Sequence, residues 1–204
     1  MSRPGQLDAR YHRAKQEGFA ARSVYKLEEI ERRYRLFRPG QKVLDLGAHP
    51  GSWLQFACGR VGTGGLVVGV DLQEAGVDLP RQARWRVADL MAIAPEELAE
   101  FAPAYDLVLS DAAPRTTGVA HADMAASLAL TGRALDLALM LLKPGGSFVA
   151  KVYFGPGVEE LIRRVKAAFS LGKAHKPEAS RAASKEIYLL GRGYRGQPAR
   201  SQKL

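Results

Sequence analysis

Apolar residues along the chain fall into short continuous runs that alternate with stretches of helical spacing. Runs of the strand type lie at residues 43–46, 66–70, 83–88, 105–110, 147–152 and 186–190. Helical spacing marks residues 23–34, with Ser23 as the N-cap, and then residues 52–61, 122–142 and 158–169. A short basic helix is expected within residues 7–21, whereas residues 170–184 give little signal. Alternating strands and helices predict an α/β fold with a doubly wound, mostly parallel sheet.

The most informative stretch is Lys42–Phe56, KVLDLGAHPGSWLQF, where a strand leads through a glycine turn into a helix. Open α/β sheets build nucleotide pockets in this way. With one glycine before Pro50, the stretch lacks both the dinucleotide pattern G-x-G-x-x-G and a P-loop. Asp45 at the mouth of the turn would also repel a pyrophosphate. A cationic adenosine ligand such as S-adenosylmethionine (SAM) fits better; the alternative is a tight turn without a ligand.

Charged residues follow several of the other expected strands. Asp71 ends the second strand, where ribose hydroxyls are commonly bound, and Asp111 ends the fourth. Asp89 follows the third strand and either accepts from an adenine amino group or caps a turn before Pro95. Lys151 lies near the end of the fifth strand, where a charge is costly unless the strand opens into a site. Together these residues predict a SAM site along one edge of the sheet.

The sequence also narrows the acceptor of a methyl group. Methylation at pyrimidine C5 usually needs a cysteine nucleophile, but Cys58 lies in the helix after the glycine turn, which is the wrong place. Methylation of exocyclic amines usually uses Asn/Asp-Pro-Pro-Tyr/Phe after the fourth strand, and this chain has Asp-Ala-Ala-Pro from Asp111. A hydroxyl acceptor remains, and it needs a base or an orienting cation.

Charge is distributed unevenly along the 204 residues, which carry a net charge of +9. Basic residues exceed acidic ones in residues 1–41 and 151–204, while residues 42–150 are net acidic. Basic ends around an acidic centre suggest that the ends bind a polyanion such as nucleic acid. Aromatic residues lie among the N-terminal basic ones, which favours nucleic-acid binding over a role of the basic ends in solubility alone. They are Tyr11, Phe19, Tyr25 and Tyr34.

Several other features of the sequence indicate the compartment in which the protein works. The single cysteine excludes an internal disulfide and suits a reducing compartment. The N-terminus lacks a signal-peptide h-region, and the most apolar stretch, 124–142, is interrupted by Arg133 and Asp136. We therefore expect a cytoplasmic protein with no membrane span. None of the four histidines has a metal-ligand spacing, and no metal is expected.

Five stretches, in this order, give the chain a specific resemblance to a known family. They are ARSVYKLEEI (21–30), VLDLGAHPGSW (43–53), LSDAAPRTTG (109–118), FVAKVYFG (148–155) and ASRAASKEIYL (179–189). In these stretches the sequence resembles the FtsJ/RrmJ (RlmE) family of ribosomal RNA 2′-O-ribose methyltransferases. The resemblance implies a Rossmann-like SAM-dependent methyltransferase fold with a seven-stranded sheet and helices on both faces.

The resemblance also implies roles for particular residues. The family's Lys-Asp-Lys-Glu catalytic tetrad falls on Lys26, Asp111, Lys151 and Glu186. The implied SAM contacts, with their neighbours in the same turns, are Asp45, Gly47, Pro50, Gly51, Ser52, Trp53, Asp71, Leu72, Asp89, Leu90 and Asp111. His49 and Ser52 depart from the commoner Ala-Pro-Gly-Gly-Trp form of the loop. A surface salt-bridge cluster is the alternative for the tetrad.

The implied function is methyl transfer from SAM to a ribose 2′-hydroxyl, on a uridine of large-subunit (23S) ribosomal RNA. The alternatives are the same chemistry on transfer RNA or an mRNA cap, and a catalytically silent SAM- and RNA-binding ribosome assembly factor. Lys151 is either the general base or a cation that orients the oxygen. We expect one methyltransferase domain, acting as a monomer, with a basic N-terminal extension (1–41) and a flexible basic tail (192–204).

Overall fold

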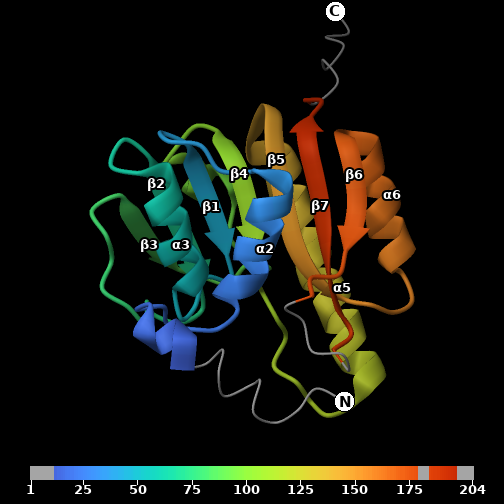
Figure 1. Ribbon diagram of the computed structural model, residues 1–204. Helices are drawn as coiled ribbons and strands as arrows, with labels where there is room; N and C mark the ends of the chain where they lie inside the picture. The colour runs from blue at the N-terminus through green and yellow to red at the C-terminus, as the bar shows by residue number, and fades with distance from the viewer. Residues whose placement is uncertain (1–11, 179–183, 197–204) are drawn as a thin grey trace, which may run out of the picture.

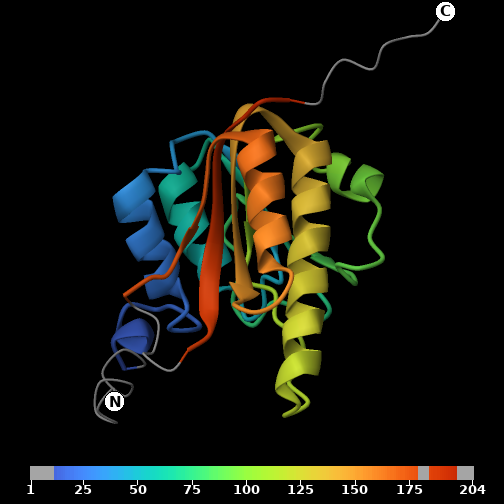
Figure 2. The same ribbon diagram turned by 90° about the vertical axis from the view of Figure 1, so that its right-hand side faces the viewer.

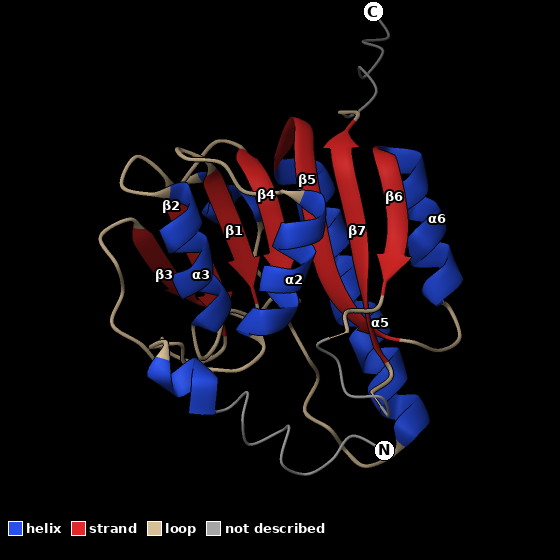
Figure 3. Cartoon of the chain, viewed as in Figure 1, coloured by secondary structure: helices blue, strands red, loops and turns tan. Residues whose placement is uncertain are grey.

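A seven-stranded sheet forms the centre of the computed structural model, which describes residues 12–178 and 184–196 (Figures 1 and 3). The strand order is β3-β2-β1-β4-β5-β7-β6. Strands β1 to β5 pair in parallel, and β7 runs antiparallel between β5 and β6. The strands are β1 (Lys42–Leu46), β2 (Leu66–Asp71), β3 (Ala83–Val87), β4 (Tyr105–Ser110), β5 (Leu142–Tyr153), β6 (Phe169–His175) and β7 (Glu186–Tyr194). The expected mostly parallel, seven-stranded fold is confirmed.

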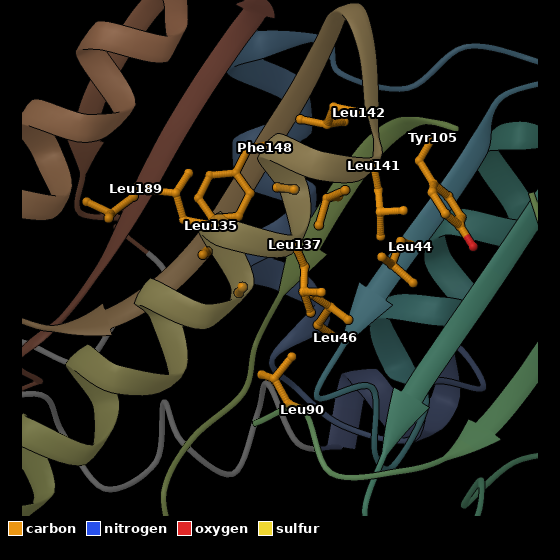
Figure 4. Close-up of a cluster of buried hydrophobic side chains, with 14 of the residues drawn as sticks. Leu44, Leu46, Leu90, Tyr105, Leu135, Leu137, Leu141, Leu142, Phe148 and Leu189 are labelled. Carbon is orange, nitrogen blue, oxygen red and sulfur yellow. The ribbon is translucent and has the colours of Figure 1, made fainter. Parts of the chain in front are cut away.

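Helices cover both faces of this sheet, as Figure 2 shows in side view. The helices α2 (Val24–Tyr34) and α3 (Ser52–Val61) lie on one face, and α4 (Pro95–Ala99), α5 (Ala120–Leu141) and α6 (Val158–Ala168) lie on the other. Each face has its own buried core. The core under α5 draws leucines from β1, β5 and β7 as well as from the helix (Figure 4). Continuous apolar strands such as β4 form because both of their faces are buried.

The core under α3 contains Cys58, the one cysteine of the chain. Burial and, to a lesser extent, the charge of the neighbouring Asp45 carboxyl raise the pKa of its thiol to about 12. The thiol is thus a small apolar core group at neutral pH.

In the described part of the chain, α5 is the one helix long and apolar enough to cross a membrane, judged by length and composition alone. One side of α5 packs against the sheet, with Ala134, Leu135 and Ala138 fully buried. Its role as a core helix accounts for its apolar character.

Several expected elements differ from those observed. Residues 170–184 give little signal in the sequence, and β6 occupies their first part as an edge strand that is mostly exposed or half-buried. The Lys143–Gly146 segment was expected to stop a helix before a strand at 147. Instead β5 begins at Leu142, which pairs with Tyr105, and the register shifts before Leu107 pairs with Ser147. Residues 192–194, expected in the tail, complete β7, and residues 197–204 lie outside the described chain.

The N-terminal aromatic residues pack differently from the expectation that they alternate with basic residues to bind nucleic acid. Tyr25 and Tyr34 are 7% and 6% exposed and belong to the core between α2 and the sheet. Phe19 packs against the same core, and Tyr11 lies outside the described residues. The described aromatics therefore stabilise the docking of α2, and nucleic-acid stacking is not their role.

Strand order reverses between β1 and β4, which is the topological switch point where doubly wound sheets bind ligands. Gly47 ends β1 with a φ of +73°, and a Cβ there would lie 2.5 Å from the Cα of Ala112. Because only glycine permits both that conformation and that approach, the turn after β1 packs directly on the loop after β4.

Candidate active site

Two ammonium–carboxylate pairs lie at the carboxyl edge of the parallel strands, the lower edge in Figure 1. In the first pair, Lys26 Nζ of α2 donates to Glu186 Oε2 at the start of β7, at 2.5 Å. The two side chains are 17% and 23% exposed. Ser184 Oγ also donates to Glu186 Oε2, at 3.0 Å. Residues 160 positions apart in the chain are thus brought together.

The second pair joins Lys151 of β5 to Asp111, which follows β4. Lys151 Nζ lies 3.0 Å from Asp111 Oδ1 and donates to the Asp111 backbone oxygen at 2.7 Å. The Lys151 side chain is 7% exposed, so its charge depends on this partner. Because β4 and β5 are adjacent parallel strands, their ends place the two residues side by side.

Tyr188 connects the two pairs, and the sequence analysis did not single it out. It lies opposite Lys151 in the β5–β7 register, and its hydroxyl donates to Asp111 Oδ1 at 3.2 Å. Lys26 Nζ lies 6.0 Å from the centroid of its ring. The ring also stacks on Trp53, with centroids 5.9 Å apart. A signal was available, because residues 186 and 188 of a strand share one face.

The charges of this cluster shift one another's proton affinities. Burial alone lowers the pKa of Lys151, but the Asp111 and Glu186 carboxylates more than offset it, and the net direction is upward. Burial raises the pKa of Glu186, but Lys26 and Lys151 lower it, and the net direction is downward. Both groups are therefore ionised at neutral pH. Burial, together with Asp111, also keeps the Tyr188 hydroxyl protonated by raising its pKa.

The glycine turn lies beside this cluster and has a close-packed backbone. Gly51 has a φ of +117°, and a Cβ there would lie 2.6 Å from Val77, in the loop between β2 and β3. The two residues that depart from the commoner loop both bind neighbouring segments. Ser52 Oγ lies 3.1 Å from Ser23 Oγ, and His49 Nδ1 lies 3.0 Å from the Glu74 backbone oxygen. Ser23 therefore joins α2 to α3, and its side chain makes no capping bond to its own helix.

Asp71 and Asp89 both accept backbone hydrogen bonds. The two oxygens of Asp71 accept from the N–H groups of His49 and Gln73, each at 3.0 Å, so this carboxylate holds the glycine turn. Asp89 Oδ1 accepts from Met91 N–H at 2.9 Å, which matches the turn role left open by the sequence. A carboxylate oxygen has more than one acceptor position, so these bonds leave capacity for a ligand.

Asp45 lies deeper than its sequence position suggests. It is 0% exposed, and among the described residues neither of its oxygens has a hydrogen-bond partner. Burial, followed by repulsion from Asp111 and Asp71, raises the pKa of its carboxyl well above the ordinary value. The expectation that it sits at the mouth of the turn is wrong. Leu90 is also buried, whereas Leu72 is 62% exposed beside Asp71.

The described residues include no group of three or more His, Cys, Asp or Glu side chains placed to hold a metal ion. What the carboxyl edge does hold is a glycine turn with Asp71 bound to it, Asp89 in the turn after β3, and two ion pairs around a tyrosine. This combination, at the switch point of a doubly wound sheet, is that of an α/β transferase with a nucleoside-binding turn.

Comparison with known proteins identifies the class more closely. Residues 19–194 match the model of the FtsJ-like methyltransferase family, and the chain belongs to that family. A ribosomal RNA large subunit methyltransferase E from Desulfosudis oleivorans is 48% identical over 179 residues, covering 88% of this chain and 86% of the relative. A protein of the same name from Nitratidesulfovibrio vulgaris is 46% identical over 191 residues, covering 93% and 94%.

Among solved structures, a Plasmodium falciparum protein described as a ribosomal RNA methyltransferase superposes with a TM-score of 0.76 at 25% identity. The match covers 88% of this chain and all of that one. The seven-stranded sheet and its helices are thus those of a methyltransferase family, as the resemblance implied.

Proposed function

We propose that this protein transfers a methyl group from SAM to a ribose 2′-hydroxyl of large-subunit ribosomal RNA, with a uridine of 23S RNA as the target. The observation that carries the proposal is the convergence of Lys26, Asp111, Lys151 and Glu186 at the carboxyl edge. The names of the relatives, which are 46–48% identical, support the RNA substrate. We further propose that it acts as a cytoplasmic monomer.

The residues at the switch point fit a cofactor of this kind. The turn from Gly47 to Gly51 carries no phosphate-binding lysine, and Asp71 and Asp89 keep acceptor capacity for ribose and adenine. Ser52 and Trp53 bind Ser23, and the Pro50 backbone oxygen accepts from Gly76 N–H, so these bonds hold the turn and the helix after it. Leu72 and Leu90 follow Asp71 and Asp89 in the chain. When bound there, SAM supplies the methyl group. Asp45 is too deeply buried for direct contact, so its role would be to shape the turn.

Lys151 is best suited to orient the acceptor oxygen. An ammonium has three N–H donors, and two of those of Lys151 are directed to Asp111. The third remains for a ribose oxygen, whose free lone pair would then point to the methyl group. Positioning the reacting atoms about 3 Å apart accounts for a large share of catalysis in such reactions. Its raised pKa makes Lys151 a poor base in this state.

The other members of the cluster hold Lys151 and the substrate in place. Asp111 fixes the Lys151 ammonium through two oxygens, and Tyr188 orients Asp111. Glu186 adds negative charge near Lys151 and binds Lys26. Lys26 keeps donors for a phosphate or hydroxyl of the RNA.

Transfer of labelled methyl groups into large ribosomal subunits that lack the modification tests the proposal. The wild type should label the RNA at a linkage that resists alkaline hydrolysis, because a methylated 2′-oxygen cannot attack its phosphate. Lys151→Ala should lower kcat at least ~100-fold. The control is Arg164→Ala, which breaks the 2.5 Å ion pair between Arg164 of α6 and Asp136 of α5. This variant should not lower kcat. Transfer that survives Lys151→Ala would refute the site, and SAM binding without transfer to any RNA would favour the assembly factor.

The pH dependence of kcat separates the two roles of Lys151. As an orienting cation it stays protonated below its raised pKa, so kcat should be flat between about pH 7 and pH 9. As a base it would need to be neutral, and kcat would rise about tenfold per pH unit in the same range.

A further inference from the structure

A second charged site lies at the opposite end of the sheet from the tetrad. A pocket of about 450 Å³ is formed where β5 and β6 begin and β7 ends, at the top of the molecule in Figure 1. Four basic residues line it: Arg35, Arg38, Lys143 and Arg192. They come from the end of α2 and the loop after it, the start of β5 and the end of β7. The two basic ends of the sequence therefore meet here.

The pocket has a net positive charge that neighbouring carboxylates do not cancel. Asp106 is the one acidic residue among its described lining residues. One Asp106 oxygen pairs with Lys143 Nζ at 2.8 Å, and the other accepts the Lys42 backbone N–H at 2.7 Å. Within residues 12–178 and 184–196, no carboxylate pairs with Arg35, Arg38 or Arg192. Three guanidinium groups are thus available to one solvent-accessible cavity.

Arg35 ends helix α2 in a backbone conformation that is unusual for an arginine. It adopts the left-handed conformation with a φ of 49°, and its backbone N–H donates to the Glu31 carbonyl to close α2. Glycine is the residue that fits this conformation without strain. The chain instead places an arginine there, and that arginine is one of the residues that line the pocket.

We propose that this pocket binds a backbone phosphate of the substrate RNA, away from the reacting nucleotide. Guanidinium groups match phosphate oxygens in two-point hydrogen bonds, and several converging ones favour phosphate over a carboxylate. The inference rests on the proposed RNA substrate.

The two sites are separated by the length of β5. At the two ends of β5, Leu142 pairs with Tyr105 and Ala150 pairs with Ser110, five positions apart in β4, which places these ends about 17 Å apart. A folded or longer ribosomal RNA presents phosphates at such separations, whereas an RNA that carries the target nucleotide alone does not reach both sites. The pocket therefore favours a longer RNA, such as that of the subunit, over an isolated target nucleotide.

Salt-dependent RNA binding by variant proteins tests the proposal. Arg35→Gln with Arg192→Gln removes two pocket charges, and Arg163→Gln with Lys166→Gln removes two from the exposed face of α6. The pocket variant should bind large-subunit RNA several-fold more weakly, with a salt slope shallower by about 1, and the α6 variant should show less than half of either effect. Arg35→Lys with Arg192→Lys should restore most of the slope. Equal slopes for the pocket and α6 variants would overturn the proposal.

Two further measurements identify the ligand of the pocket. A short RNA that carries only the target nucleotide should bind the wild type and the pocket variant equally, and unequal binding would overturn the separation of the two sites. Phosphorus NMR titrations measure whether inorganic phosphate binds the wild-type pocket. If it binds there while the wild type and the pocket variant bind RNA equally, the pocket is a site for free anions and the proposal is overturned. Methyl transfer is measured in parallel: a pocket effect on RNA binding without transfer by the wild type would reject the proposed function and retain the pocket.

Discussion

Strands β4 and β5 carry a lysine–aspartate pair at each end, and the two pairs have different surroundings. At the carboxyl edge, Lys151 and Asp111 are 7% and 17% exposed and belong to a connected cluster. At the amino edge, Lys143 and Asp106 are 44% and 26% exposed and border an open basic pocket. Their N–O distances are similar, 3.0 and 2.8 Å. Burial and neighbouring charge, more than pairing itself, therefore separate a site suited to chemistry from one suited to binding.

Neutralising the two aspartates should have opposite functional effects. Asp111→Asn weakens the hold on Lys151 and should lower kcat at least ~100-fold. Asp106→Asn removes the acidic group from the basic pocket and should tighten RNA binding a few-fold. Initial rates of methyl transfer across RNA concentrations measure both effects. A large fall in kcat for Asp106→Asn, or none for Asp111→Asn, would break the distinction between the two edges.

Truncating the same aspartates should separate the pairs by stability. Asp111→Ala leaves a buried ammonium without its carboxylate and should lower the free energy of unfolding by about 3 kcal/mol. Asp106→Ala exposes Lys143 to water and should cost about 1 kcal/mol. Urea unfolding at neutral pH gives both values. Similar losses would mean that burial is not what distinguishes the two pairs.

The carboxyl edge should also show the stronger dependence of stability on pH. Glu186 has a lowered pKa in the folded protein, so its contribution is present above its ordinary pKa of 4.5 and is lost as the pH falls through the folded value. The difference in unfolding free energy between wild type and Glu186→Gln should thus shrink from pH 6 to pH 3. The exposed Glu159→Gln is the control. A difference that stays constant in acid would contradict the lowered pKa of Glu186.

The smallest effect is expected from the C-terminal segment. Removing residues 197–204 deletes Arg200 and Lys203, close in sequence to Arg192 of the pocket. Because the pocket already carries four basic residues, the Kd for large-subunit RNA should rise less than about threefold. Fluorescence anisotropy at two salt concentrations measures it, and a larger rise would shift the binding role from the pocket to the tail.

Much of the fold could be predicted from local patterns. The helix from Ser52 to Val61 and the strand from Tyr105 to Ser110 have the expected bounds, because a glycine turn or a continuous apolar run defines each. The edge strand β6 was missed because FSLGKAH mixes serine, glycine, lysine and histidine with few large apolar residues, and only Phe169 in it is fully buried. The early start of β5 was missed because Lys-Pro-Gly-Gly is typical of a break, and only pairing with Tyr105 makes it a strand.

The candidate site, too, could be predicted from the sequence only in part. Asp111 and Lys151 stood out as charges at strand ends, whereas Lys26 and Glu186 required the family resemblance, because their contact spans α2 and β7. Asp45 was placed wrongly, since residue spacing does not show how closely α3 covers β1. The basic pocket could not be foreseen at all. Its arginines belong to no recognisable sequence motif. Only the fold brings Arg35 and Arg38 together with Arg192 at one pocket.

The single buried cysteine has a practical consequence. Thiol-directed dyes react with the thiolate, and Cys58 is enclosed in the core with a pKa near 12. A cysteine introduced on the surface would therefore be the one group that such a dye modifies in the folded protein. A fluorophore placed beside either edge of the sheet can report when RNA arrives there, without replacement of the native residue.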